Sequence, residues 1–476
     1  MTRSFDSQRT PLTMLYRIML PLLIFSYWPL LQLGTRYGMH LDISLLYIAC
    51  LVFVVARLAI AIKQRELAHI AAFARTSRPL LALTGWLVIA AASIAWSDNP
   101  FRAVTTVVFS AAMLANMLFI AYDYKVLHRH AVLYVKLLSV ATIGLAAFAL
   151  WQLFFDAIGW HGVTLLPATY SSTVFGFARP IGFCLEPQFL GNLMLIPALF
   201  ASWTILSQRT TIQGNTIYAV AFFACLTILL TLSRGAIYAL AAGLAIQLVL
   251  AAVRQPRTRE RVIRVISITL ASVVVALGAV YSAATINTRD NIDGYEAVSK
   301  YADQLTLGAI SLPAPARSDE SSRAAASAAT RPSTEPTDDT AGYVRESTDS
   351  RLAMSSLALK LWNERAATRL FGIGIGSFGL SAHAYDPRYS TSSIVNNHYL
   401  EMLVETGIVG AGCFVAGLGM LVYGAMRRAA YGAATILLAL LLQWSFFSGS
   451  ANVIHVWVAA GVVAGLLVHT KTPRRT

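Results

Sequence analysis

GAIYALAAGLAIQLVLAAV, residues 235–253, is followed by RQPRTRERVIR at 254–264 and by a second apolar run at 262–284. A run of about 20 apolar residues is long enough to cross the hydrocarbon core of a bilayer as a helix. The arginine-rich connection is typical of a loop that stays in the cytoplasm, because positively charged loops are retained on that side. This stretch therefore predicts two membrane-spanning helices joined by a cytoplasmic loop.

The same alternation of apolar runs and short polar connections extends over the whole chain. Of its 476 residues, 57% are hydrophobic and only 13% are charged, and the mean hydropathy is +0.61. The core of a soluble protein could not bury so much apolar surface. The sequence predicts an all-α, polytopic membrane protein with about twelve transmembrane helices. They are expected at 14–34, 42–62, 79–96, 103–122, 131–155, 187–207, 214–232, 235–253, 262–284, 399–425, 430–448 and 451–470.

Lysine and arginine residues are concentrated in the even-numbered connections and at both termini. The positive-inside rule places all of these segments in the cytoplasm, and the odd-numbered connections then face the periplasm. The net charge of +14 is therefore a topology signal, and no nucleic-acid partner is expected. Besides the arginine-rich connection, the basic residues are Arg3, Arg9, Lys63, Arg65, Arg75, Arg78, Lys125, Arg129, Arg209, Arg427, Arg428, Lys471, Arg474 and Arg475.

Three regions follow from this topology: helices 1–9 within residues 1–284, a large periplasmic loop between helices 9 and 10 at 285–398, and helices 10–12 within 399–476. In the loop, residues 312–341 are rich in Pro, Ala, Ser and Thr, which predicts a disordered insertion. Residues 343–369 carry apolar side chains at helical spacing and predict an amphipathic helix at the membrane surface.

The four cysteines do not form a metal-binding or disulfide pattern. They are scattered and no two are spaced as C-x-x-C, so neither a zinc site nor a disulfide framework is expected. No other metal cluster or nucleotide-binding loop is recognisable, and no cofactor is expected. The cysteines are Cys50, Cys184, Cys225 and Cys413.

Three polar segments on the predicted periplasmic side are candidate functional sites, because charges near hydrocarbon are costly and tend to be functional. In the first, Arg234 lies at the start of an apolar helix. A cation is unfavourable at this positive end of the helix dipole, and a bound anion would offset the conflict. The alternative is an interfacial arginine that reaches the lipid head groups.

In the second segment, Arg179 and Glu186 lie at the entry of the helix that begins near Pro187. Proline is favourable in the first turn of a helix, and a carboxylate there is stabilised by the helix dipole. Arg179 is a candidate partner of Glu186 or a second ligand for an anion. A purely structural ion pair is the alternative.

The third segment opens the tenth predicted helix. His398, Glu401 and Glu405 are spaced i, i+3 and i+7, so they share one helix face. A histidine above two carboxylates is suited to proton transfer near neutral pH. An interfacial histidine without a chemical role is the alternative.

Six motifs in order resemble the O-antigen ligase and polymerase superfamily of bacterial polysaccharide assembly, over most of residues 80–420. The resemblance implies a metal-independent, inverting membrane glycosyltransferase of the GT-C type, at the periplasmic face of the bacterial inner membrane. Its donor would be a glycan on undecaprenyl diphosphate. The motifs are WSDNPFRA at 96–103, RPIGFCLEPQFLGN at 179–192, TLSRGAIYALAAG at 231–243, the Arg351 before LALKLWNE, LFGIGIGSFG at 370–379 and NNHYLEMLVETGIVG at 396–410.

Carried over by position, the resemblance makes Arg234 and Arg351 ligands of the diphosphate, with Arg179 as a third. The family's usual histidine corresponds here to Asn396. The neighbouring His398 is the favoured catalytic base, with Glu401 or Glu186 as alternatives.

The favoured reading is a polymerase that joins lipid-linked repeat units of an O-antigen or exopolysaccharide. The Glu186-Pro187 pair supports it, because ligases frequently have Asn-Pro at this point. The alternative is a ligase that transfers the finished glycan to an acceptor such as lipid A core. A transporter or flippase is a third reading, although the repeated halves typical of transporters are not recognisable in the sequence.

Overall fold

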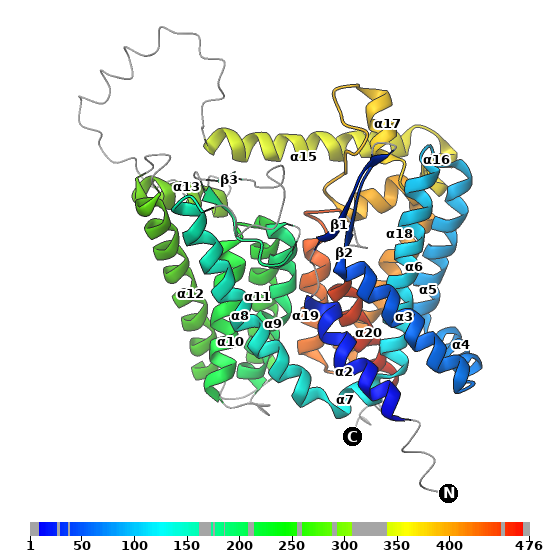
Figure 1. Ribbon diagram of the computed structural model, residues 1–476, viewed down its shortest axis with the longest axis horizontal. Helices are drawn as coiled ribbons and strands as arrows, with labels where there is room; N and C mark the ends of the chain where they lie inside the picture. The colour runs from blue at the N-terminus through cyan, green and yellow to red at the C-terminus, as the bar shows by residue number, and fades with distance from the viewer. Residues whose placement is uncertain are drawn as a thin grey trace, which may run out of the picture.

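The apolar runs form helices that lie side by side between the two ends of the molecule (Figure 1). The computed structural model describes residues 9–25, 29–36, 39–160, 173–174, 177–184, 186–207, 214–254, 259–287, 293–306, 340–448 and 453–469. Within them the regular secondary structure is helical apart from two small two-stranded sheets. The apolar helices are α2 (Arg9–Phe25), α3 (Leu45–Lys63), α5 (Arg78–Ala92), α6 (Pro100–Tyr122), α8 (Ala131–Ala157), α9 (Pro187–Ser207), α10 (Gly214–Leu230), α11 (Arg234–Arg254), α12 (Arg259–Ile286), α18 (His398–Arg427), α19 (Tyr431–Gln443) and α20 (Ile454–His469).

Seven helices of the described chain are long and apolar enough to cross a membrane: α6, α8, α9, α11, α12, α18, and α5 with the short 3-10 helix η1 (Ser93–Trp96). The count becomes eight if α3 and α4 (Leu67–Thr76), bent by 113°, form one broken span. Other apolar helices are shorter, and α19 has only 13 residues. A helix of that length covers about 20 Å of a core about 30 Å thick. A multi-pass membrane protein is confirmed, and about twelve spans stays a prediction.

The first expected span, 14–34, is wrong in its second half. Helix α2 ends at Phe25, and β1 (Pro29–Arg36) pairs antiparallel with β2 (Met39–Ser44). Pro29 lacks the N–H needed to continue a helix, and the apolar residues that follow are interrupted by Gln32, Gly34 and Thr35. Mean hydropathy does not detect this change from helical to strand periodicity.

One end of the bundle is covered by short helices and by α15 (Thr340–Asn363), which crosses it at a steep angle to the bundle helices (Figure 1). Helices α13 (Gly294–Thr306), α16 (Ala366–Phe371) and α17 (Phe378–Tyr385) lie at the same end. The surface helix expected at 343–369 corresponds to α15 and α16, which are separated by a break after Asn363. Most of the insertion expected at 312–341 lies outside the described residues.

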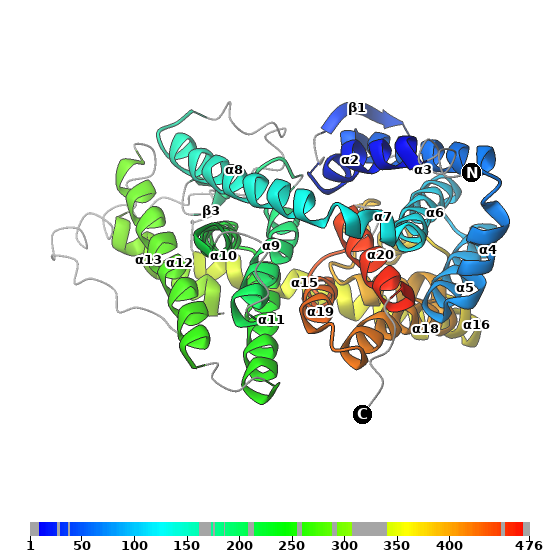
Figure 2. The same cartoon turned by 90° about the horizontal axis from the view of Figure 1, so that it is seen from below.

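Seen from below, α10 and α12 lie on one side of the molecule and α5 and α6 on the other (Figure 2). Helices α9, α11 and α19 pack against one another between these sides. Gly191 of α9 permits part of this packing, because a Cβ there would lie 2.6 Å from the Cβ of Ala236 in α11. The small residues thereby place the starts of α9 and α11 close together.

The glycine motif at 370–379 docks onto a kink in α18. Gly407 has a φ of 66°, which breaks the helix. Ile373 N donates to Val404 O at 2.9 Å, and Gly374 N donates to Glu405 O at 3.1 Å. A Cβ on Gly407 would lie 2.2 Å from Leu370 O. The motif therefore satisfies carbonyl groups that the kink leaves without helical partners.

The motif WSDNPFRA packs against the same glycine segment from the other side. Ser97 Oγ donates to Ile375 O at 2.9 Å and lies 2.8 Å from Ser377 Oγ. Asp98 N donates to Ser377 Oγ at 3.0 Å. Two motifs almost 280 residues apart thus form one contact, which gives both of them a structural role.

A buried ion pair joins α2, α3 and α6 at the opposite end of the bundle. The Arg57 side chain is 0% exposed, and its Nε and Nη2 donate to the two carboxylate oxygens of Asp123 at 2.6 and 2.9 Å. Nη2 also lies 2.9 Å from Glu66 Oε2, and Tyr16 OH donates to Asp123 Oδ2 at 2.6 Å. The bidentate geometry offsets the cost of removing these charges from water.

We expect Asp123→Asn to lower the free energy of unfolding by about 3–5 kcal/mol, because Arg57 would stay buried without its main counter-charge. Thermal unfolding in detergent, followed by circular dichroism, measures this loss. The control is Glu260→Gln, which removes an exposed pair with Arg264 (3.8 Å) and should cost no more than about 1 kcal/mol. Equal stability of the two variants would contradict the role of the buried pair.

Candidate active site

A cavity of about 160 Å³ lies where the starts of α9 and α11 meet α15 and the end of α19. We call it the arginine pocket. It brings together four of the six residues predicted to bind the diphosphate or act as the base, namely Arg179, Glu186, Arg234 and Arg351, from three segments of the chain. It is lined by Arg179, Glu186, Pro187, Gln188, Leu232, Ser233, Arg234, Gly235, Arg351, Ile394, Asn396, Gln443 and Phe446.

Arg234 is positioned by a tight turn between α10 and α11. Leu232 has a φ of 52°, and Ser233 N donates to Thr231 Oγ1 at 3.2 Å. Arg234 is the first residue of α11, so it lies beside first-turn amide groups that have no partner within the helix. Gly235 lets this turn approach the end of α19, because a Cβ there would lie 2.6 Å from Phe446 Cβ. The turn thus presents a cation and a helix N-terminus to the same cavity.

Arg351 reaches the pocket from α15. Its Nη1 donates to Phe446 O at 2.8 Å. Phe446 is also the residue that packs against Gly235. One residue therefore sets the spacing of two arginines that come from segments more than 100 residues apart in sequence.

Glu186 is the one acidic residue among the residues that line the pocket. It accepts a hydrogen bond from Gln188 Nε2. Burial raises the pKa of the Glu186 carboxyl, although the hydrogen bond from Gln188 and the positive charges of Arg179 and Arg351 act in the opposite direction. A carboxylate with a raised pKa is a stronger base than a carboxylate in water.

The segment that carries Arg179 and Glu186 is held by a buried glutamine of α8. Gln152 Oε1 accepts from Ile181 N at 3.1 Å and from Gly182 N at 2.8 Å, and its Nε2 donates to Gly182 O at 3.1 Å. Gly182 has a φ of 58°, a conformation that side chains disfavour. The side-chain amide of Gln152 thus supplies backbone hydrogen bonds that a helix or strand would otherwise provide to this segment.

A chain of hydrogen bonds leads from the arginine pocket into the middle of the bundle. Gln443 Nε2 donates to Gln188 O at 3.0 Å, and Asn192 Nδ2 donates to Gln443 Oε1 at 2.7 Å. His455 Nε2 donates in turn to Asn192 Oδ1. Each amide is a donor on one side and an acceptor on the other, so the chain fixes how Gln443 is oriented in the pocket wall.

His398, the catalytic base favoured from the sequence, does not line the arginine pocket. Its ring is buried and lies edge-on to Phe414 and Trp444, with centroid distances of 5.4 and 5.2 Å. His398 Nδ1 lies 3.1 Å from Glu401 Oε2, and Nε2 has no hydrogen-bond partner among the described residues. The histidine and Glu401 therefore face the interior of the bundle.

Asn396 lies in the pocket wall, two residues before this histidine. Its φ of 58° is in the left-handed region, which asparagine tolerates better than most residues. Asn397 then caps α18, and its side chain accepts from Tyr399 N and Leu400 N. Because the backbone changes direction sharply at Asn396, the side chain of Asn396 lies in the pocket wall, whereas that of His398 lies in the interior of the bundle.

Glu405 also has a structural role. It is buried, and its Oε1 accepts from Phe378 N at 3.3 Å, at the start of α17. A carboxylate at a helix N-terminus is favourable because of the free amide groups and the helix dipole there. The acidic stripe of α18 thus divides into Glu401, which contacts His398, and Glu405, which holds the glycine motif.

Residues 219–415 match the model of the O-antigen ligase family. Over this segment the chain is similar to that family. This match confirms the resemblance to the O-antigen ligase and polymerase superfamily, and it implies a glycosyltransferase-like enzyme. No curated protein shows significant similarity to the chain.

The matched segment contains Arg234, Arg351 and His398, whereas Arg179 and Glu186 precede it. The arginine pocket is therefore assembled from the matched segment and from residues on both sides of it, with Gln443 and Phe446 following it in the chain. Sequence reasoning missed Gln152 and Gln443, although a glutamine inside an apolar span is itself a signal, because a buried amide requires partners.

We expect Gln152→Leu to release the segment at 181–182, because two N–H groups and one carbonyl lose their partner. Each unsatisfied group costs about 1–3 kcal/mol when it stays buried, so the amides of Ile181 and Gly182 should exchange hydrogen faster. The measurement is hydrogen exchange with mass spectrometry. Ser139→Ala is the control, since Ser139 bonds within α8. Unchanged exchange in Gln152→Leu would contradict the role of this glutamine.

Proposed function

We propose that the protein polymerises polysaccharide repeat units carried on undecaprenyl diphosphate, at the periplasmic face of the bacterial inner membrane. The observation that carries this proposal is the arginine pocket, where Arg179, Arg234 and Arg351 surround a cavity of about 160 Å³ beside Glu186. Pockets for drug-sized ligands measure about 300–1,000 Å³. The cavity is suited to a compact charged group such as a diphosphate, with the glycan and the lipid outside it.

The arginines act on the leaving group. Guanidinium groups bind phosphate oxygens in a bidentate manner and stay charged at all relevant pH values. As the bond between the anomeric carbon and the phosphate oxygen breaks, negative charge grows on that oxygen. Arginines already fixed in place, such as Arg351 by its bond to Phe446, stabilise this charge without reorganisation.

Glu186 is the base in this proposal. The acceptor hydroxyl attacks the anomeric carbon with inversion, its proton passes to the Glu186 carboxylate, and undecaprenyl diphosphate leaves. Of the three candidates His398, Glu401 and Glu186, only Glu186 lines the arginine pocket. Its raised pKa suits it to accept a proton.

The polymerase is favoured over the ligase by the Glu186-Pro187 pair, where ligases frequently have Asn-Pro. The ligase is the second candidate, because the matching family model is described as O-antigen ligase. Its acceptor would be lipid A core instead of a second lipid-linked repeat unit. A transporter or flippase gives no role to a base in the pocket and is the least supported reading.

Deletion of the gene, followed by complementation, tests the activity and the arginines together. We expect Arg234→Lys to lower the transfer rate by about 10-fold or more, and Arg234→Ala by on the order of 10²–10³-fold, because lysine lacks the bidentate geometry. Surface glycans are measured by gel electrophoresis. The exposed Arg365, on the same end of the molecule, gives the control Arg365→Lys. Polymer of normal length from an inserted Arg234→Ala protein would exclude the arginine pocket as the diphosphate site.

The product of the deletion strain distinguishes the two enzymes. Loss of a polymerase leaves single repeat units on the acceptor, whereas loss of a ligase leaves finished polymer on its lipid carrier. Unchanged glycans on the cell surface would contradict both activities.

We expect Glu186→Gln to lower the transfer rate by on the order of 10²–10⁴-fold while the donor still binds. In the wild type the transfer rate should be low at pH values below the raised pKa of Glu186 and should increase as the pH rises through that pKa. The reason is that only the ionised carboxylate accepts a proton. Transfer is measured on purified protein in detergent. His398→Gln, which is buried outside the pocket, should retain turnover. An active Glu186→Gln together with an inactive, folded His398→Gln would assign the base to His398.

A further inference from the structure

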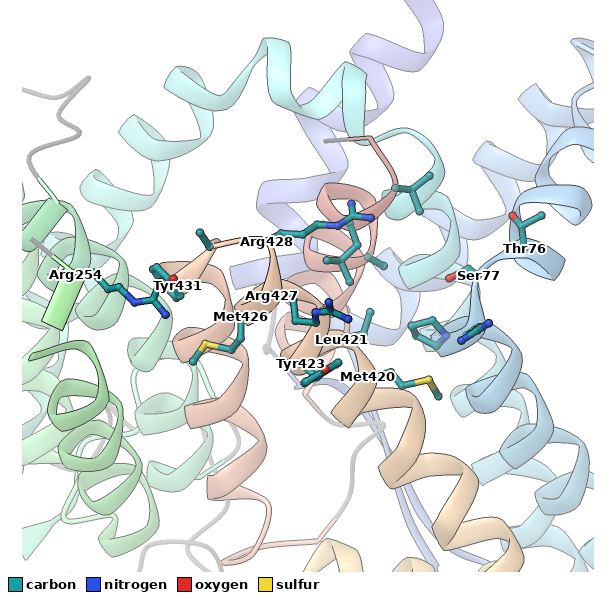
Figure 3. A pocket seen from close by; sticks show the side chains of 17 residues that line it. Thr76, Ser77, Arg254, Met420, Leu421, Tyr423, Met426, Arg427, Arg428 and Tyr431 are labelled. Carbon is teal, nitrogen blue, oxygen red and sulfur yellow. The ribbon is translucent and has the colours of Figure 1, made fainter. Parts of the chain in front are cut away.

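A larger cavity lies at the end of the bundle opposite the arginine pocket. Arg234 and Arg254 are the first and last residues of α11, and the two residues line different cavities. The larger one has a volume of about 1060 Å³. We call it the basic-end cavity (Figure 3), and it lies between the start of α5, the ends of α11, α18 and α20, and the start of α19. Its lining is Thr76, Ser77, Arg78, Pro79, Arg254, Met420, Leu421, Tyr423, Gly424, Met426, Arg427, Arg428, Ala429, Tyr431, Ala464, Leu467 and Val468.

Four arginines line this cavity and no acidic residue does. Figure 3 labels three of them, with Arg254 beside Tyr431 and with Arg427 and Arg428 near the end of α18. The guanidinium carbon of Arg254 lies 5.5 Å from the ring centroid of Tyr431, and that of Arg427 lies 5.8 Å from the ring of Tyr423. Within the described residues, neither arginine forms an ion pair with a carboxylate. Arg254 and Arg427 are thus oriented by aromatic rings, and the residues that line the cavity supply no carboxylate.

The positive-inside rule explains why arginines occur here, and the negative ends of the helix dipoles of α11 and α18 stabilise Arg254, Arg427 and Arg428. Neither effect requires a cavity. The arginines belong to a hollow whose other walls are apolar, with Met420 and Leu421 from α18 and Leu467 and Val468 from α20. A ligand that fits must therefore be anionic at one end and apolar at the other.

We propose that the basic-end cavity binds an anionic phospholipid, with the phosphate held by the arginines and the first part of the acyl chains against α18 and α20. Arginine matches phosphate oxygens by its planar, bidentate geometry. Basic pockets between transmembrane helices are suited to lipid head groups. A soluble phosphate compound would leave the apolar wall exposed to water, which is why the membrane lipid is the better occupant. The proposal is independent of the reaction in the arginine pocket.

The test uses the purified full-length protein in detergent, with phosphatidylglycerol as the probe and phosphatidylcholine and glycerol 3-phosphate as comparisons. We expect phosphatidylglycerol to raise the Tm, and the two comparison compounds to have little effect. In the double variant Arg254→Gln, Arg427→Gln the affinity for phosphatidylglycerol should fall by on the order of 10-fold or more. Arg264→Gln, at the same end but outside the cavity lining, is the matched control and should behave like the wild type.

An equal response to phosphatidylcholine, or an undiminished response in the double variant, would overturn the proposal. An equal response to glycerol 3-phosphate would overturn it in favour of a soluble phosphate ligand. If the double variant does not fold, a photoactivatable phosphatidylglycerol is cross-linked to the wild type. Adducts at residues 420–431 or 464–468 support the site, and adducts found only elsewhere exclude it. Arg234→Lys should leave this lipid response intact, so failure of the lipid site and failure of the proposed reaction are distinguishable.

Discussion

The carbonyl group of Phe446 joins the elements on which the arginine pocket depends. It accepts from Arg351 of α15 at 2.8 Å, and the same residue packs against Gly235 at the start of α11. Arg234 and Arg351 therefore share one support, which follows α19 directly in the chain. A helix that crosses the bundle on its surface can contribute to a defined site because its arginine bonds to backbone instead of to a mobile side chain.

Most of the helices and the arginines could be predicted from the sequence, because both leave local signals. Apolar runs predict spans from about 20 consecutive residues, and an arginine between two such runs is costly enough to be conspicuous. The hairpin of β1 and β2 escaped prediction because its apolar content resembles a helix. The chain from Gln443 to Asn192 escaped because its members lie 251 residues apart, and no local pattern records such a contact.

The position of His398 shows how finely a site depends on backbone direction. The sequence places Asn396 and His398 two residues apart, and either one could be expected to face the arginines. The left-handed φ of Asn396 and the cap formed by Asn397 turn the chain between them. Asn396 remains in the pocket wall, whereas His398 enters an aromatic cluster with Trp444. Neither the left-handed turn nor the cap has a signal strong enough in the sequence to decide between the two residues.

Arginines occur at both ends of the bundle, but the same charge has a different origin at each end. At the basic end they follow the positive-inside rule, and three of the four, Arg254, Arg427 and Arg428, also lie at the favourable negative ends of helix dipoles. In the arginine pocket the three arginines lie on segments that this rule assigns to the other side, and Arg234 occupies the unfavourable positive end of a helix dipole. Glu186 is the one acidic residue in the pocket lining. The diphosphate that we propose as the ligand would place further negative charge beside Arg234 and so favour its position at the helix N-terminus. No such compensation is needed for arginines at the negative end of a helix dipole.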